Sequence, residues 1–279
     1  MGKKILVTGA TGNVGHHLVR DLIGKGEKVV AATRHATAVP GAEARRFDLT
    51  DPATLPGLFE GVDRAYLMVP AGHVNVLDLM LPLIDAAAKA GVKVVLQSVF
   101  GVDADDEIPY RKAEIALERS GVPFVILRPN WFADNFHTYW REGVRHGVIA
   151  VPAADGASSF IDTRDIAASA AAALTSDRFD GQAFNLTGPE GLTYAEAAAI
   201  LSDAAGRAVR YQPTDDAAFV GMLTGAGVPA DYAGMLAAIF HPVRQGWTAT
   251  VTGDVRTLTG RDPIALKTYA RDNHAALVD

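Results

Sequence analysis

The sequence has no cysteine among its 279 residues. This absence excludes disulfides, thiolate metal ligands and cysteine nucleophiles. Long hydrophobic runs are also missing: no stretch of about 18 uncharged apolar residues occurs, so no membrane span is predicted. Basic residues are in deficit, with a net charge of −6, whereas a general nucleic-acid binder needs an excess of them. We expect neither a membrane nor a nucleic acid as a partner.

Two catalytic patterns are missing as well. The eight histidines form neither an H-E-x-x-H nor an H-x-H spacing, so no metal is expected. None of the seven tyrosines has a lysine four residues later, which excludes the Tyr-x-x-x-Lys pair of many short-chain reductases. The opening Met-Gly-Lys-Lys leads into an apolar run without the layout of a signal peptide. We expect a cytoplasmic monomer or homodimer.

Short apolar runs alternate with segments of helical periodicity. Six buried strands are predicted at residues 3–8, 28–33, 44–48, 64–69, 93–98 and 123–128. Helices are predicted at 14–23, 51–59, 74–90, 110–120 and 161–174, with a further strand at 183–186. Strands linked by helical crossovers are typical of an α/β fold with a Rossmann-type, doubly wound parallel sheet.

The C-terminal third is predicted to be mainly helical. Thr193 and Glu196 have the spacing of a capping box, and helices follow at 216–224, 231–240 and 264–277. We therefore expect a nucleotide-binding Rossmann domain at 1–187 and a small C-terminal substrate or lid domain at 188–279. Residues 134–160 are expected to contribute to the substrate cleft of the first domain.

A glycine-rich turn follows the first predicted strand. Residues 9–15 read G-A-T-G-N-V-G and lead into a helix. Glycines allow a close approach to a pyrophosphate, and the N-terminus of a helix offers free N–H groups. The spacing also suits a plain strand–helix turn, but its place at the head of an alternating chain favours a dinucleotide. The predicted contacts are Gly9, Thr11, Gly12, Asn13, Val14 and Gly15.

The end of the second predicted strand indicates which dinucleotide binds. An NAD site usually has an acidic residue there for the ribose 2′-OH, whereas this chain has Arg34 and His35. Arg34 can clamp a 2′-phosphate, so NADPH/NADP⁺ is the expected cofactor, with His35 beside it. A solvated surface cation is the alternative for Arg34. Asp48 could bond the adenine amino group or cap a turn.

Residues after the middle strands are predicted to lie near the nicotinamide, because ligands of such sheets bind beyond the carboxyl ends of the strands. Val69, Pro70 and Pro129 are expected to line the cofactor. The expected substrate pocket consists of Phe100, Asn130, Trp131, Phe132, Phe136 and His137. A planar, conjugated acceptor would suit these aromatic rings, although aromatic clusters are also typical of a core.

The opening KKILVTGATGNVGHHLV, the position of Arg34, the segment LRPNWF at 127–132 and Asn135–Phe136 resemble NmrA-like atypical short-chain dehydrogenase/reductases. The tail at 252–263 is similar to bacterial members, so the resemblance spans nearly the whole chain. It implies a Rossmann domain, NADPH use and a small substrate domain, and triphenylmethane-dye and quinone reductases are the similar types. NmrA itself is a dinucleotide-sensing regulator without known turnover.

Three residues are candidates for catalysis. The segment K-A-E-I at 112–115 resembles the lysine segment of isoflavone-type reductases, which implies that Lys112 holds the ribose and nicotinamide or polarises a substrate oxygen. Ser98 ends the fifth predicted strand, and Tyr110 could supply a phenolic proton. A surface lysine and a packing tyrosine are the alternatives. The acidic residues at 103–107 are expected to form a solvated turn.

Together these patterns predict an NADPH-dependent reductase that transfers a hydride to a quinone, dye, imine or enone. Because a fold does not fix a function, two alternatives stay open. One is a non-catalytic NADP(H)-sensing regulator. The other is a non-redox isomerase or cyclase on the same fold.

Overall fold

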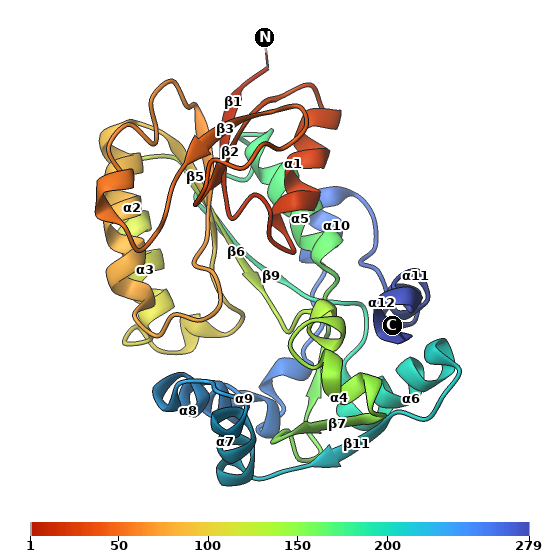
Figure 1. Ribbon diagram of the computed structural model, residues 1–279. Coiled ribbons are helices and arrows are strands. Elements are labelled where there is room, and N and C mark those ends of the chain that lie inside the picture. Colours follow the sequence, from red (N-terminus) through yellow and green to blue (C-terminus); the bar gives the residue numbers. More distant parts are fainter. Residues whose placement is uncertain (1, 279) are drawn as a thin grey trace. The chain divides into compact units, whose positions relative to one another are not determined.

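Seven parallel strands form the central sheet of the structure, a computed structural model that describes residues 2–278 (Figure 1). Residues 1 and 279, the outer limits of the two predicted domains, lie outside the described residues. The strand order is β3-β2-β1-β4-β5-β6-β9. The bounds are β1 (Lys4–Thr8), β2 (Lys28–Thr33), β3 (Ala42–Arg46), β4 (Arg64–Leu67), β5 (Lys93–Gln97), β6 (Phe124–Pro129) and β9 (Gln182–Leu186).

The strand order reverses between β1 and β4. The chain first runs outward from β1 to β3 and then returns to β4 on the other side of β1. Because β4 and β5 are buried at every position, they need apolar residues on both faces. The predicted Rossmann-type fold is confirmed, and the strand predicted at 183–186 joins the sheet beside β6 as its seventh member.

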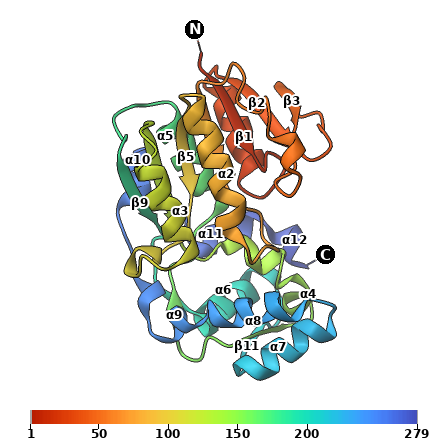
Figure 2. The ribbon, with the colours of Figure 1, turned by 90° about the vertical axis from the view of Figure 1, so that its left-hand side faces the viewer.

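Helices cover both faces of this sheet. On one face α1 (Gly15–Gly24) packs against α5 (Thr163–Leu174), and α10 (Asp254–Thr259) also packs on α5. On the other face α2 (Val76–Lys89) packs against α3 (Pro109–Glu118), as Figures 1 and 2 show. The crossover helices therefore lie on both faces of the sheet, which is the doubly wound arrangement predicted from the sequence.

The chain forms two compact units that interleave along the sequence. Unit 1 consists of Met1–Pro129, Thr163–Leu186 and Asp254–Gly260, and unit 2 of Asn130–Asp162, Thr187–Gly253 and Arg261–Asp279. The sequence prediction divided the chain once, after residue 187. That functional division stays a prediction, because the compact units are assembled from separate stretches.

Unit 2 is mainly helical around an aromatic core. Its helices are α4 (Arg141–Arg145), α6 (Tyr194–Ala205), α7 (Asp216–Gly225), α8 (Ala230–Ala238), α9 (His241–Arg244), α11 (Leu266–Asp272) and α12 (His274–Val278). Two small sheets complete it: β7 (Val148–Val151) with β11 (Arg210–Pro213), and β8 (Ala157–Ser158) with β10 (Leu192–Thr193). The capping box of Thr193 and Glu196 is confirmed at the start of α6.

Two predicted helices are wrong in extent. The segment 51–59 contains only the 3₁₀ turn η1 (Pro52–Thr54), because Pro56 has no N–H to donate and Gly57 takes a φ of +79°. The segment 264–277 forms two helices, interrupted at Asn273, whose amide Nδ2 donates to the Tyr269 carbonyl. Within residues 2–278 no helix is long and apolar enough to cross a membrane.

Candidate cofactor and active site

The turn between β1 and α1 needs glycine at several positions. Gly9 has a φ of +63°, and a Cβ there would lie 2.9 Å from the Met68 sulfur. The N–H of Gly12 donates to the Gly9 carbonyl at 2.9 Å, which closes the turn. A Cβ on Gly15 would lie only 2.0 Å from the Gly9 oxygen. The helix can therefore begin this close to the strand only with glycine at position 15.

The N-terminus of α1 is open to an anion. Its N-cap residue, Val14, makes no side-chain capping hydrogen bond, and no acidic residue lies in the first turn. Thr11, Gly12 and Asn13 are exposed, whereas Val14 and Gly15 are buried. Exposed glycine backbone beside an uncapped helix N-terminus is the arrangement that a pyrophosphate needs. These residues thus fit the phosphates of the predicted cofactor.

Arg34 and His35 lie on an exposed turn directly after β2. The Thr33 carbonyl accepts from the Ala36 N–H at 3.2 Å, and the Thr33 hydroxyl accepts from the Thr37 N–H at 2.7 Å. Both Arg34 and His35 are exposed, and the Arg34 guanidinium has no ion-pair partner within residues 2–278. The turn therefore presents a cation that a 2′-phosphate could bind.

Asp48 caps the turn after β3. Its Oδ1 accepts from the N–H and from the hydroxyl of Thr50, at 2.9 and 2.8 Å. These hydrogen bonds, together with the charges of Arg34 and Arg46, hold the pKa of Asp48 below its ordinary value. The turn-capping alternative is thus observed, and the contact of Asp48 with adenine stays a prediction.

The segments that follow the middle strands are tied together at the carboxyl end of the sheet. After β4, Val69 is buried and Pro70 is exposed. Ser98, directly after β5, is buried, and its N–H donates to the Leu127 carbonyl at 2.7 Å. The Phe100 N–H donates to the carbonyl of Pro129, the last residue of β6, at 3.1 Å. The predicted residues Ser98, Phe100 and Pro129 therefore share one edge of unit 1.

A buried ion pair that the sequence reasoning missed lies beneath this edge. Arg128 of β6 donates from Nε to Glu114 Oε1 at 2.9 Å and from Nη2 to Oε2 at 2.7 Å. The Glu114 side chain is fully buried. Burial alone would raise the pKa of Glu114, but the hydrogen bonds and charge of Arg128 lower it below the ordinary value. A single charge in the otherwise apolar strand FVILRP was the available signal, because such a charge needs a partner.

The acidic loop at 103–107 is more than the solvated turn expected from its composition. Asp103 pairs with Arg128, Asp106 with Arg111, and Glu107 with Lys112. Each pair connects the loop to β6 or to α3. All four acidic residues are exposed, so the expected solvated turn is confirmed, and three of its carboxylates in addition pair with basic side chains.

Ser98 directly follows β5, whereas Tyr110 and Lys112 lie in the first turn of α3. Lys112 has a side chain 40% exposed, and its Nζ lies 2.7 Å from Glu107 Oε2. Tyr110 is half-buried and packs against the apolar core of unit 1. The Arg128–Glu114 pair joins α3, which carries Tyr110 and Lys112, to β6. Their catalytic roles stay predictions.

The predicted pocket residues of unit 2 fall into two groups. Trp131 and Phe132 are half-buried, whereas Phe136 is fully buried in the aromatic core, which favours the core alternative for Phe136. The Nδ1 of His137 is a hydrogen-bond partner of the Tyr269 hydroxyl. Burial lowers the pKa of His137, and the charges of nearby aspartates partly offset that effect.

Asn130 uses its whole amide group inside unit 2. Its Nδ2 donates to the Ser159 hydroxyl at 2.7 Å and to the Thr248 carbonyl at 2.8 Å. Its Oδ1 accepts from the Trp131 N–H at 2.9 Å. Asn130 therefore organises neighbouring segments, which is a different task from the direct substrate contact predicted for it.

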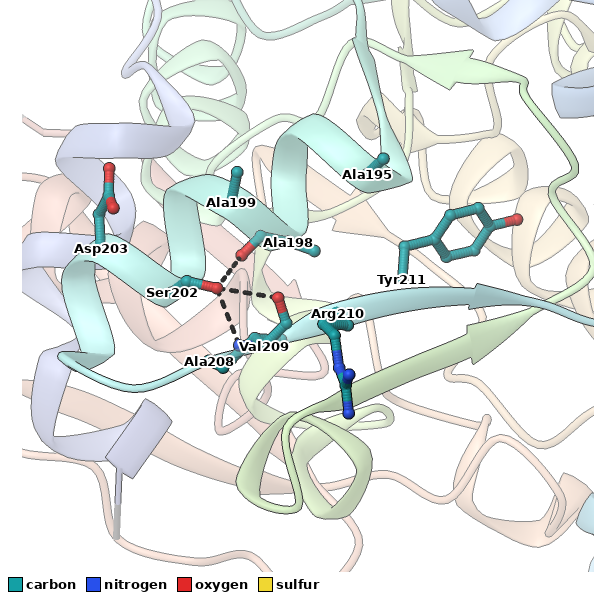
Figure 3. A pocket seen from close by; sticks show the side chains of 9 residues that line it. All are labelled: Ala195, Ala198, Ala199, Ser202, Asp203, Ala208, Val209, Arg210 and Tyr211. Atoms are coloured by element: carbon teal, nitrogen blue, oxygen red, sulfur yellow. Dashed lines mark hydrogen bonds between the residues drawn. The ribbon is translucent and has the colours of Figure 1, made fainter.

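A surface hollow of about 560 Å³ lies between α6 and β11 of unit 2 (Figure 3). Four of its nine lining residues are alanines, and Asp203 and Arg210 also line it. Within the lining, the Ser202 hydroxyl donates to the Val209 carbonyl and accepts from the Val209 N–H, both at 2.8 Å. None of the predicted site residues lines this hollow, and no pattern in the sequence predicts it.

The reversed strand order, the glycine turn and the open helix N-terminus define a Rossmann-type fold with a nucleotide-binding loop. The chain belongs to the NmrA-like family, whose model matches residues 1–248. The family resemblance predicted from the sequence is thereby confirmed.

Known relatives extend over nearly the whole chain. An NAD(P)H azoreductase of Xenophilus azovorans is 32% identical to this chain, and the alignment covers 98% of each protein. The triphenylmethane reductase of Citrobacter sp., solved with NADP(H), is 25% identical, with a TM-score of 0.81 over 97% of this chain and 99% of that one. The Escherichia coli quinone oxidoreductase QOR2, solved with NADPH, is 26% identical, with a TM-score of 0.82 over 96% and 99%.

Proposed function

We propose that the protein is an NADPH-dependent reductase that transfers a hydride to a small conjugated acceptor such as a quinone, a dye, an imine or an enone. The observation that carries the proposal is the glycine turn at an uncapped helix N-terminus, with an exposed cation after the next strand. The activities for which the azoreductase, dye reductase and quinone oxidoreductase relatives are named support the same proposal.

Different residues of unit 1 would bind different parts of the cofactor. The turn from Gly9 to Gly15 would hold the pyrophosphate, and Arg34 the 2′-phosphate. Val69, Pro70 and Pro129 would line the nicotinamide end, because they end or follow strands at the carboxyl edge of the sheet. Bound NADPH would supply the hydride, that is, one hydrogen nucleus with two electrons.

The chain's own part in the chemistry is to orient the acceptor and to manage one proton. Reduction of a quinone consumes the hydride and a proton and yields NADP⁺ and a hydroquinone, so a proton must reach the acceptor oxygen. Lys112 and Tyr110 carry protons that could be donated or shared there. Water in an exposed site could supply the same proton, which is why turnover of variants decides their roles.

The decisive experiment measures NADPH consumption against a panel of acceptors: a quinone, an azo dye, a triphenylmethane dye, a cyclic imine and an enone. We expect consumption that depends on the acceptor and is weaker with NADH. Arg34→Ala should weaken NADPH binding by about 1.5–3 kcal/mol and leave NADH binding unchanged, because only NADPH has the 2′-phosphate.

Arg20→Ala is the matched control, since Arg20 is an exposed arginine of the same unit, on α1. Equal affinity for both cofactors would contradict the role of Arg34. Tight NADPH binding without NADPH oxidation in the presence of any acceptor would contradict the reductase function and favour the non-catalytic sensor. Conversion of a substrate without cofactor consumption would favour an isomerase or cyclase.

A further inference from the structure

Arg46 ends the outermost strand of the large sheet, beside the turn that carries Arg34. In the parallel pair of β2 and β3, Arg46 lies opposite Thr33, the last residue of β2, and the Phe47 N–H donates to the Thr33 carbonyl at 3.0 Å. Arg34 directly follows Thr33. Because paired strands lie about 4.8 Å apart, the two arginines leave the sheet from adjacent positions within unit 1.

The side chain of Arg46 lies on the face of the sheet that α1 covers. Successive side chains of a strand point to opposite faces, so Arg46 and its neighbour Arg45 are on opposite sides. Arg45 lies opposite Ala32, which belongs to the core cluster formed with α2 and α3. Arg46 is therefore on the side of α1, the helix whose N-terminus would hold the pyrophosphate.

The Arg46 guanidinium is exposed, and its ion pair is weak. The side chain is 66% exposed, and its Nη2 lies 3.5 Å from Asp51 Oδ2. An exposed pair of this kind contributes little to stability, because water competes for both charges. The other oxygen of Asp51, Oδ1, accepts from the Ala53 N–H at 3.1 Å and caps η1. The arginine can therefore leave Asp51 for another anion while the carboxylate keeps its place at the cap.

The charges of Arg34 and Arg46 act on the same point after β3. The hydrogen bonds of Thr50 lower the pKa of Asp48 most, and the charges of Arg34 and Arg46 add to that effect. Both guanidinium groups are thus within electrostatic range of one carboxylate. A phosphate group bound beside Arg34 would be attracted by both arginines.

We propose that Arg46 is a second 2′-phosphate-binding residue: with NADPH bound, its guanidinium exchanges Asp51 for the phosphate that Arg34 also binds. The inference rests on the proposed function and deepens it, because it adds a residue of β3 that determines cofactor specificity. Two guanidinium groups can donate to different oxygens of one phosphate, whereas a ribose 2′-OH offers them no charge. Asp51 competes with the phosphate for Arg46 and so lowers the affinity for NADPH.

The first test measures the Kd of NADPH and of NADH by isothermal titration, without any acceptor. Arg46→Ala should raise the Kd of NADPH roughly three- to tenfold, and Asp51→Asn should lower it about two- to threefold, whereas the Kd of NADH should change far less. Asparagine can keep the Oδ1 acceptor for the Ala53 N–H, so η1 keeps its cap. Arg46→Lys keeps the charge and should lie between the wild type and Arg46→Ala.

Arg45→Ala is the matched control, because it removes the neighbouring arginine on the other face of the same strand. It should lower the melting temperature, since Arg45 donates to the Leu58 and Glu60 carbonyls, without changing the ratio of the two Kd values. A wild-type preference for NADPH that Arg46→Ala leaves intact would overturn the inference and leave the proposed function standing. A gain of NADPH affinity in Asp51→Asn that NADH shares equally would also overturn it.

Two smaller probes isolate the phosphate itself. Adenosine 2′,5′-bisphosphate and adenosine 5′-monophosphate differ only in the 2′-phosphate. The wild type should bind the bisphosphate more tightly, and the double variant Arg34→Ala/Arg46→Ala should bind both probes equally. A loss in the double variant no larger than in Arg34→Ala alone would overturn the role of Arg46. Equal binding of both probes by the wild type would instead contradict the 2′-phosphate site as a whole, and with it the NADPH preference of the proposed function.

Discussion

Arg128 illustrates at the scale of one residue how a charge is kept inside an apolar sheet. Its guanidinium donates to both carboxylate oxygens of Glu114, so the pair has no net charge and both oxygens have a hydrogen-bond donor. The helix α3, which carries Lys112, is thereby joined to β6. The importance of such a pair lies in what is left when one partner is removed, because an unpartnered buried carboxylate is costly.

Removal of that guanidinium should strongly destabilise the protein. Arg128→Ala should lower the free energy of unfolding by up to about 3–5 kcal/mol, as measured by urea denaturation, because Glu114 stays buried and keeps only its ion pair with Arg111. Arg145→Ala is the control: its partner Glu142 is exposed, and the expected change is below about 1 kcal/mol. Similar losses in both variants would contradict the role assigned to burial.

The catalytic role of Lys112 was predicted from the resemblance of only four residues, 112–115, and substitution of Lys112 tests it. Lys112→Ala should lower turnover at least about tenfold at saturating NADPH if the ammonium polarises the acceptor oxygen. Lys89→Ala, which removes an exposed lysine from α2, should leave turnover unchanged. Unchanged turnover in Lys112→Ala would mean that Lys112 is the ion-paired surface residue of the alternative interpretation.

At the scale of elements, the glycine turn and α1 together form the predicted phosphate-binding site. Two glycines of α1 distinguish an effect on that site from an effect on the helix alone. Gly15→Ala should abolish measurable NADPH binding and lower stability, because its Cβ would lie 2.0 Å from the Gly9 oxygen. Gly24→Ala meets nothing within 4 Å and should stabilise the helix by about 0.5–1 kcal/mol. Isothermal titration with NADPH and thermal melts measure both effects, and normal NADPH affinity in Gly15→Ala would contradict this account.

The strands of the large sheet could be predicted from the sequence because each is a short buried run with its own turn signals. All seven strands occur within two residues of their predicted ends. The pair β7 and β11 could not be predicted, because the two runs of four residues pair across about 60 intervening positions and local periodicity carries no sign of that pairing. The helix predicted at 51–59 failed where the proline and glycine at 56 and 57 interrupt it.

The candidate site likewise contains parts that the sequence predicts and parts that it does not. The glycine turn and the Arg34 turn could be placed from spacing alone, since both directly follow predicted strands. The Glu114–Arg128 pair and the hydrogen bond from Asn130 to the Thr248 carbonyl depend on contacts between separate segments. Phe136 shows what the sequence alone cannot decide. An aromatic residue after a strand end can belong to a pocket or to a core, and its burial in the structure distinguishes the two.

At the scale of the whole molecule, acid should act on stability through Glu114. Its pKa is held below the ordinary value of 4.5 in the folded state. The folded protein therefore binds a proton less readily than the unfolded chain, and the stabilisation is complete above pH 4.5 and is lost as the pH falls through the lower folded pKa.

Urea denaturation of the wild type and Glu114→Gln between about pH 7 and pH 3 measures this contribution. The glutamine variant should be less stable at neutral pH, and the difference between the two proteins should shrink below the ordinary carboxyl pKa. Two curves that stay parallel down to the lowest pH would mean that Glu114 titrates normally in the folded protein.

The interleaving of the two units has a consequence for how such a protein can change over evolutionary time. Each unit is built from three separate stretches of the chain. A single recombination event between related genes would therefore exchange only part of a unit and separate strands or helices from their partners, for example β7 from β11. One crossover therefore cannot exchange a whole unit as a module, and substitutions within the fixed architecture are the simpler route by which such a chain changes.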